Sequence, residues 1–172
     1  MNDQPRVRNI IKRTTLIVRD MAASVRWYEH VLGMSVWLDT EYVLSGEGIA
    51  AGNPGDRTHL VILKAEDDKI GMIGLLQWLD PPLPAPEIDY SVGFGTPVFV
   101  VETSDAGGLA RRAEELGTRI KTRERLFTVT GAGGQIRHLK GTVLYDPDGH
   151  IFECNQVLRI EHPPATKTAT KT

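Results

Sequence analysis

The chain has 172 residues, of which 41% are hydrophobic and 24% are charged, and its formal net charge at pH 7 is −2. This length suits one compact domain or two small modules that share a core, and the composition is typical of a soluble globular protein. The near-neutral charge argues against a nucleic-acid-binding surface, and no apolar run reaches the roughly 18 residues of a membrane span. We therefore expect neither nucleic acid nor membrane as a partner.

The single cysteine, Cys154, excludes an intrachain disulfide and a cysteine-based zinc site. We interpret it as a small buried hydrophobic residue rather than a nucleophile. Residues 1–9 are polar and are expected to be loosely ordered, and they lack the apolar core of a signal peptide. A reducing cytoplasm is therefore the expected location.

The first half of the chain is predicted to form one strand, one helix and three further strands. The helix is expected to begin after Asp20, which can cap its first turn, and to end at Gly33. The Gly-rich segment 46–56 lacks the Lys-Ser/Thr ending and the strand–loop–helix setting of a phosphate-binding loop. The strands are expected at residues 10–18, 34–45, 58–65 and 70–78.

Four prolines in residues 79–93 predict a linker, after which the same order of elements returns. A strand is expected at 95–102, and a helix capped by Ser104 or Thr103 should end at Gly117. A strand at 118–124 and a Gly-rich loop at 131–134 follow. Residues 159–172 are rich in Thr, Lys and Pro and are expected to be disordered.

The segment Asp146-Pro147-Asp148-Gly149 predicts the turn of a β-hairpin between two strand-like runs. The simplest geometry is a three-residue loop with Gly149 in the bulge position, which pairs Glu153 with Val143. One carboxylate then stands on a largely apolar face, where it could also be a rim residue or the partner of an arginine. The residues of this face are expected to be Arg137, Leu139, Gly141, Val143, Tyr145, Ile151, Glu153 and Asn155.

A shift of 79 residues aligns the hairpin with the first half of the chain, so that Glu153 falls on Gly74 and Gln156 on Gln77. The prediction is an α+β protein with two βαβββ modules, residues 10–78 and 94–158. The modules are expected to pair, within one chain or across a homodimer, into a concave mixed sheet with the helices outside.

The sequence resembles the vicinal oxygen chelate superfamily, which includes glyoxalase I, bleomycin-resistance proteins, fosfomycin-resistance enzymes and extradiol dioxygenases. The segments that carry the resemblance, over about residues 10–157, are Leu16–Asp20, Ser24–Tyr28, Val31–Met34 and Asp146–Gly149 with Glu153. The resemblance implies the βαβββ fold, a small-molecule ligand and a homodimer. It says little about the reaction, because this superfamily hosts many chemistries.

The resemblance also implies four metal-ligand positions, which fall on Arg13, Gly74, Thr96 and Glu153. Only Glu153 has a ligand-type side chain, and a catalytic divalent ion needs about three protein ligands. We therefore predict neither a metal nor another cofactor at this place. We hypothesise an Arg13–Glu153 ion pair there, unless Arg13 lies at a solvated strand end.

The histidines are scattered, and the predicted alternation directs His59 and His138 away from the cavity, although a miscounted bulge would turn His138 inward. The cavity face is predicted to be apolar with a few polar groups, as small-molecule sites are. Arg137 could bind a ligand carboxylate or phosphate, or be a surface arginine. The predicted cavity residues are Arg13, Thr15, Ile17, Met72, Leu76, Thr96, Val98, Arg137, Leu139, Ile151, Glu153 and Asn155.

The expected function is binding of an apolar or aromatic small molecule by a protein of the glyoxalase/bleomycin-resistance type with a degenerate metal site. The alternative is an enzyme of the same superfamily, such as a lyase, an isomerase or a dioxygenase-like member. That enzyme would use Glu153 as a general base without metal, or an unrecognised metal site.

Overall fold

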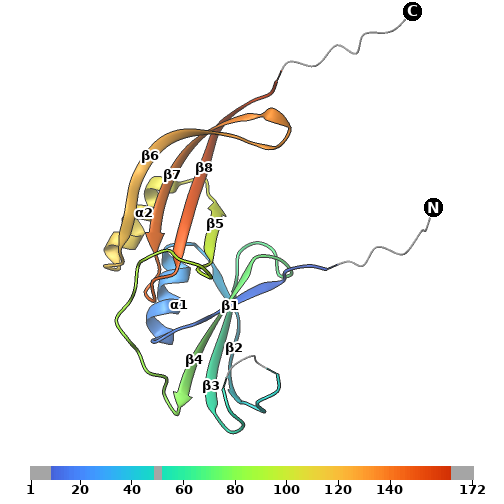
Figure 1. Cartoon of the computed structure of the whole chain (residues 1–172), viewed down its shortest axis with the longest axis vertical. Helices are drawn as coiled ribbons and strands as arrows, with labels where there is room; N and C mark the ends of the chain where they lie inside the picture. Colours follow the sequence, from blue (N-terminus) through green and yellow to red (C-terminus); the bar gives the residue numbers. More distant parts are fainter. Residues whose placement is uncertain (1–8, 49–51, 164–172) are drawn as a thin grey trace, which may run out of the picture. The chain divides into compact units, whose positions relative to one another are not determined.

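The structure is a computed structural model that describes residues 9–48 and 52–163. The chain forms two compact units, one ending at Asp89 and one beginning at Tyr90, and each is built as strand, helix and three strands (Figure 1). This confirms the predicted α+β class with two βαβββ modules. The first unit contains β1 (Arg13–Ile17), α1 (Met21–His30), β2 (Ser35–Val43), β3 (Arg57–Lys64) and β4 (Met72–Asp80). The second contains β5 (Val98–Glu102), α2 (Ala106–Glu115), β6 (Ile120–Thr130), the short 3-10 helix η1 (Ala132–Gly134), β7 (Ile136–Tyr145) and β8 (Ile151–Glu161).

The two units repeat one topology. The strand order is β1-β4-β3-β2 in the first sheet and β5-β8-β7-β6 in the second, with a parallel pair first and antiparallel pairs after it. The Oε1 atom of Gln77 accepts a hydrogen bond from the backbone N–H of Met21 at the start of α1. Gln156 does the same for Ala106 at the start of α2, so the predicted 79-residue repeat extends to side-chain contacts.

The ends of α1 follow from local chemistry. The Asp20 carboxylate accepts a hydrogen bond from the N–H of Ala23, as predicted for the N-cap. At the other end the N–H groups of Gly33 and Met34 bond back to Glu29 and Tyr28, with Gly33 at a φ of 70°. This is the left-handed termination that glycine permits without strain.

The predicted cap of α2 is wrong. Asp105, rather than Ser104 or Thr103, is the N-cap, and its Oδ1 accepts a hydrogen bond from the N–H of Gly108 at 2.8 Å. The hydroxyl of Thr103 instead accepts a hydrogen bond from the N–H of Asp105. Three polar residues in succession offered three candidate caps, and only the position of the first helical turn selects among them.

The two faces of each sheet are defined by the glutamines that contact the helices. Because Gln77 reaches α1, its alternation partners Ile73 and Leu75 face α1, and the even-numbered residues Met72 to Leu76 face the opposite side. In β8, Gln156 reaches α2, so Phe152 and Cys154 face that helix. We call the side of each sheet opposite its helix the helix-free face.

Several boundaries differ from the prediction. Strand β1 begins at Arg13 rather than at residue 10, and β6 continues to Thr130. Strand β8 continues to Glu161, three residues into the segment predicted to be a disordered tail, because it stays paired with β7 up to Ile136. The rest of that tail from residue 164, the N-terminal residues 1–8 and residues 49–51 of the Gly-rich segment lie outside the described residues. Among the described residues, no helix is long and apolar enough to cross a membrane.

Candidate functional site

The strand register assembles the helix-free face of the first sheet. Met72, Gly74 and Leu76 of β4 stand beside Arg13, Thr15 and Ile17 of β1, respectively. On the other side, Ile62 and Leu60 of β3 pair with Gly74 and Leu76, and Leu38 and Thr40 of β2 continue the same rows. The face therefore presents Arg13 at one edge of an apolar surface.

A pocket of about 360 Å³ opens on this face. Its base is a cluster of buried apolar side chains, and its polar groups are Arg13, Tyr42 and Ser45. The lining residues are Arg13, Leu38, Tyr42, Val43, Leu44, Ser45, Gly48, Leu60 and Ile62. The buried cluster consists of Leu44, Leu60, Ile62, Met72, Leu76 and Trp78, with Leu38 packed against it.

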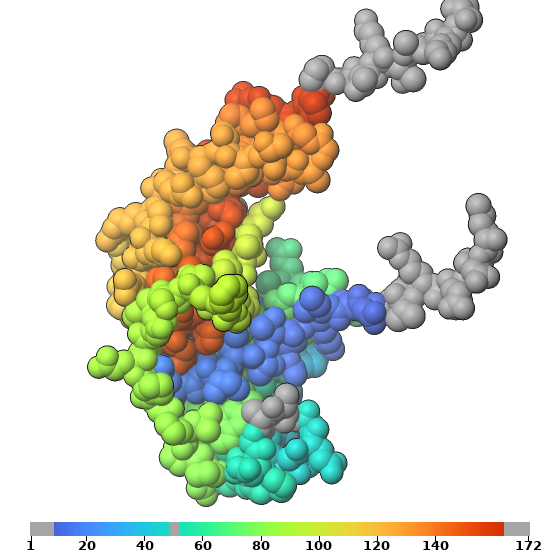
Figure 2. Space-filling model, viewed as in Figure 1, coloured from blue at the N-terminus to red at the C-terminus, as the bar shows by residue number. Residues whose placement is uncertain are grey.

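From the sequence we predicted one lining residue of this pocket, Arg13, and two members of the buried cluster, Met72 and Leu76. We did not predict the lining residues of β2 and β3. The signal was present, since Leu60 and Ile62 alternate in one strand, but the pairing of β2 with β3 shifts at a bulge between Val36 and Leu38. Residues 9–17, which include strand β1 and are blue in Figure 2, lie at the surface in that view.

Arg13 is held against the sheet because Gly74 has no side chain. A Cβ atom at Gly74 would lie 3.1 Å from Cδ and 3.3 Å from Nε of Arg13, and 2.8 Å from Oγ1 of Thr15. The aliphatic part of Arg13 therefore crosses β4 at the position that any other residue would fill. Its guanidinium group remains exposed on the pocket side, with the stem packed on the sheet.

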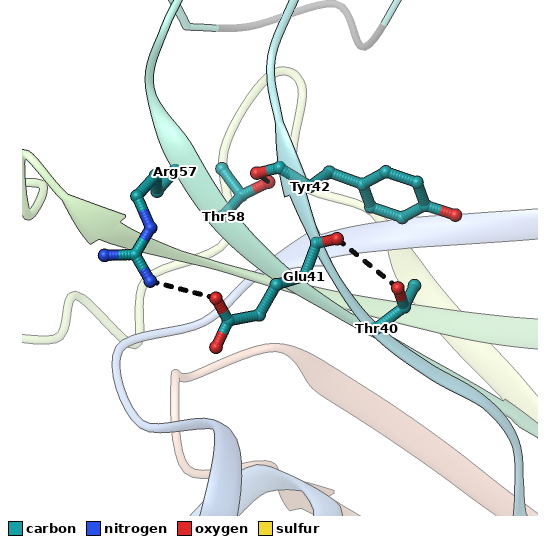
Figure 3. Close-up of polar contacts among 5 residues, drawn as sticks. All are labelled: Thr40, Glu41, Tyr42, Arg57 and Thr58. Atoms are coloured by element: carbon teal, nitrogen blue, oxygen red, sulfur yellow. Dashed lines mark hydrogen bonds and ion pairs between the residues drawn. The ribbon is translucent and has the colours of Figure 1, made fainter.

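The acidic residues of β2 lie on the other face, toward α1. The Glu41 carboxylate pairs with Nη2 of Arg57 at 3.0 Å, whereas the ring of Tyr42 projects from the opposite side of β2 (Figure 3). Asp39 pairs with Nε2 of His59 at 2.6 Å, which agrees with the prediction that His59 points away from the cavity. Alternation along one strand thus separates these carboxylates from the pocket.

The far end of the buried cluster is closed by a polar contact. The Trp78 indole N–H donates to Oδ2 of Asp56 at 3.1 Å, and the N–H of Asn53 donates to the same oxygen at 2.9 Å. Asp56 is buried, so these two donors replace the water that its carboxylate loses. The contact holds the segment after β2 against Trp78, beside the pocket wall at Leu44.

The helix-free face of the second sheet is more open. The register confirms that Glu153 pairs with Val143, and the turn between Asp146 and His150 has the three-residue loop that we predicted. Glu153 is exposed, as is its neighbour Val100 on β5. The predicted carboxylate on an apolar face is therefore present, but this unit does not bury it.

The other predicted residues of the second unit occupy different environments. Leu139 is buried, and Oδ1 of Asn155 and the ring of Phe127 both lie close to the position that a Cβ atom of Gly141 would occupy. Arg137 has a buried Nε atom without a hydrogen-bond partner among the described residues. Their role in ligand binding stays a prediction.

The position assigned to Thr96 requires correction. Val98 pairs with Ile151 as Arg13 pairs with Met72, so the residue of the second unit that corresponds to Arg13 is Val98. Thr96 lies before β5, in a turn where its hydroxyl accepts a hydrogen bond from the N–H of Gly93. The strand begins at Val98, three residues later than we predicted.

The residues at the metal positions implied by the resemblance do not fit a divalent ion. Gly74 has no ligand atom, the space above it holds the Arg13 stem, and Val98 is apolar. Among the described residues, no group of three or more His, Cys, Asp or Glu could hold a metal ion. Arg13 lies in the first unit and Glu153 in the second, and the ion pair between them stays a prediction.

Two further titratable groups of the second unit, His138 and Cys154, have structural roles. His138 bonds to Glu161 at 2.9 Å on the side of β7 opposite Val143, as predicted. Burial raises the pKa of the Cys154 thiol to about 12, which keeps it protonated and unreactive at neutral pH. This agrees with its interpretation as a buried hydrophobic residue.

The hairpin turn is organised by the buried Asp146. Its Oδ1 accepts hydrogen bonds from the N–H groups of Asp148 and His150, and its Oδ2 contacts Nδ1 of His150 at 2.9 Å. Burial acts to lower the pKa of His150, but the hydrogen bond to Asp146 and the charges of Asp146 and Asp148 outweigh it and raise that pKa. The residues of the Asp-Pro-Asp-Gly-His sequence therefore have a structural role in forming this turn.

Comparisons with solved structures show which known folds this chain resembles. It is similar to a glyoxalase family protein from Bacillus cereus at 13% identity and a TM-score of 0.69, covering 92% of this chain and 99% of that one. It also resembles the trypanothione-dependent glyoxalase I of Leishmania major, at 15% identity and a TM-score of 0.55, with 87% of each chain covered. A glyoxylase/bleomycin resistance protein/dioxygenase domain from Frankia sp. EAN1pec matches at 18% identity and a TM-score of 0.51, covering 88% of this chain and 93% of that one.

A search of curated proteins gave no match. The sequence matches the family model of the glyoxalase/bleomycin resistance protein/dioxygenase superfamily over residues 10–154, which is most of the chain. With its repeated βαβββ units and the structural similarities above, the chain belongs to the glyoxalase/bleomycin resistance protein/dioxygenase superfamily.

Proposed function

We propose that this chain is a small-molecule-binding protein of the glyoxalase/bleomycin-resistance type whose apolar or aromatic ligand occupies the pocket on the helix-free face of the first sheet. The observation that carries the proposal is the pocket itself, whose volume of about 360 Å³ lies in the range of small-molecule sites. Its buried apolar base supplies the hydrophobic contact, and Arg13, Tyr42 and Ser45 supply a few polar groups. Thr15 and Met72 belong to the same face.

Binding is favoured over catalysis by the environment of Glu153. A metal-free enzyme with Glu153 as general base needs that carboxylate shielded from water, and Glu153 is exposed. A metal-dependent enzyme needs about three ligands, which the residues at the implied positions do not provide. Thr96, Arg137, Leu139 and Asn155 belong to the second unit, and their ligand-binding roles are proposed separately from this pocket. The formation of a homodimer is proposed as well.

A fluorescence titration with N-phenylnaphthylamine, a neutral aromatic probe, tests the proposal. The probe should bind at one site, and Tyr42→Ala should weaken binding by about three- to tenfold because it removes an aromatic wall of the pocket. Trp37→Ala is the matched control, since Trp37 is an equally exposed aromatic residue of β2 outside the pocket lining. Equal loss in both variants, or no saturable binding, would refute the pocket as the site.

A further inference from the structure

The strands of the first sheet present charges of one sign on the pocket side. On the strands of the helix-free face, as far as the structure describes them, the charged residues are Arg13 on β1 and Lys64 at the end of β3. The carboxylates of Asp39 and Glu41 on β2 point to the helix side, where His59 and Arg57 pair with them. A ligand on this face therefore meets cationic side chains from the sheet and no carboxylate from it.

Asp80 does not alter this distribution. A register shift between Arg57 and Thr58 places Asp80 opposite Arg57, on the helix side of the sheet. In the segment after β2, the buried Asp56 carboxylate accepts hydrogen bonds from Trp78 and Asn53. Asp56 and the exposed Glu47 of this segment are not among the lining residues of the pocket.

Of the two cationic residues, Arg13 and Lys64, only Arg13 lies in the described lining of the pocket. Arg13 lines the pocket, and within the first unit the described residues give its guanidinium no hydrogen bond or ion pair. Lys64 lies outside the lining and near Asp67, whose pKa is lowered mainly by backbone hydrogen bonds from Lys69 and Ile70, with smaller contributions from the charges of Lys69 and Lys64.

The position of Arg13 is built into the fold. The stem of Arg13 fills the space above Gly74, and this contact fixes where the side chain leaves the sheet. Arg13 therefore has less conformational freedom to lose when a ligand binds. A planar guanidinium held in this way presents several donors to one anionic group. The aromatic ring of Tyr42 and the aliphatic side chains of Leu38, Leu60 and Ile62 are the apolar part of the same pocket.

We infer that the ligand of this pocket is an amphipathic organic anion, with an aromatic or aliphatic body on the apolar base and a carboxylate, sulfonate or phosphate group at Arg13. This inference rests on the proposed function and specifies its ligand class. It assigns to Arg13 the recognition of the anion.

Two probes with the same body separate this inference from the proposed function. Anilinonaphthalene sulfonate carries an anionic group, and N-phenylnaphthylamine is its neutral parent. The wild-type protein should bind the sulfonate about fivefold more tightly, since a partly exposed ion pair contributes about that factor. The preference should shrink as salt is added, because salt screens exposed charges.

The variants locate the effect. Arg13→Met should abolish the preference for the sulfonate, measured as the ratio of the two affinities so that any effect of the altered lining common to both probes cancels, and Arg13→Lys should keep part of the preference. Arg57→Met is the matched control, because it removes the same charge from the other face of the same sheet. Circular dichroism and thermal melts establish that each variant is folded.

Each outcome is decisive. Loss of the preference in Arg13→Met but not in Arg57→Met supports the inference. Binding of the neutral probe with no preference for the sulfonate, or equal loss in both variants, overturns the inference and leaves the proposed function standing. Failure of both probes to bind overturns the proposed function and the inference with it.

Discussion

Replacing Gly74 by alanine tests how the first unit holds Arg13. The added methyl group would lie 2.8 Å from Oγ1 of Thr15 and 3.1 Å from Cδ of Arg13, so at least one of these side chains must move. Both are exposed and can rotate without disturbing the buried cluster. The substitution is therefore expected to act on the position of Arg13 more than on the fold.

The magnitude follows from two opposing effects. Overpacking costs about 1–3 kcal/mol in a rigid core, and here the neighbours can yield. Alanine in place of a strand glycine contributes about 0.5–1 kcal/mol in the favourable direction. We expect the free energy of unfolding in urea to fall by less than about 1 kcal/mol. The preference for anilinonaphthalene sulfonate over its neutral parent should be lost nearly as fully as in Arg13→Met.

Gly93→Ala is the control for this experiment, because a methyl group there would contact nothing within 4 Å. It should change neither stability nor probe binding beyond the general effect of a glycine-to-alanine substitution. If Gly74→Ala keeps the full preference for the sulfonate, the Arg13 stem does not depend on the space above Gly74 and the reasoning is refuted.

Three side chains and the metal positions give further predictions. Cys154, whose pKa burial raises to about 12, should resist iodoacetamide in the native protein and react in urea; alkylation of the native protein would show that it is accessible. Because the pKa of His150 is raised, its protonated form stabilises the fold fully below about pH 6.5, and this contribution is lost as the pH rises through the folded-state pKa. His150→Asn should therefore lower the melting temperature more in acid than in base, and a loss that does not vary with pH would contradict this. Trp78→Phe removes a buried donor to Asp56 and should cost about 1–3 kcal/mol in urea unfolding, whereas no loss would mean that water replaces the indole N–H. Millimolar zinc or nickel should leave the melting temperature unchanged, and a rise together with stoichiometric metal by elemental analysis would show that the ligand positions were wrongly assigned.

The hairpin around Asp146 shows what sequence could predict about this fold. Its turn residues have strong local preferences, so the loop length and the pairing of Glu153 with Val143 could be worked out from the chain alone. The Asp20 cap and the Gly33 termination are local in the same way. The repeat was recognisable because both units use the same element order and place a glutamine at the same position, and the structure adds that both glutamines contact their helices in the same way.

The pocket could not be predicted in the same way, because its lining depends on pairing between distant segments. The bulge between Val36 and Leu38 changes which residues of β2 share a face with Ile62, and no simple alternation reveals it. The packing of Arg13 on Gly74 depends on the parallel register of β1 with β4, which joins segments about 60 residues apart. The wrong assignment of Thr96 has the same origin, since the start of β5 is set by its pairing with β8.

Methyl NMR of the protein with N-phenylnaphthylamine tests the central claim most directly, because it reports where a small molecule binds. We expect saturable shifts in the methyl signals of Leu38, Leu60 and Ile62, which lie on the helix-free face of the first sheet. Val61 and Leu75, which face α1 in the same sheet, should be much less affected. Shifts confined to the helix side or to the second unit, with Leu60 and Ile62 unchanged, would contradict the account.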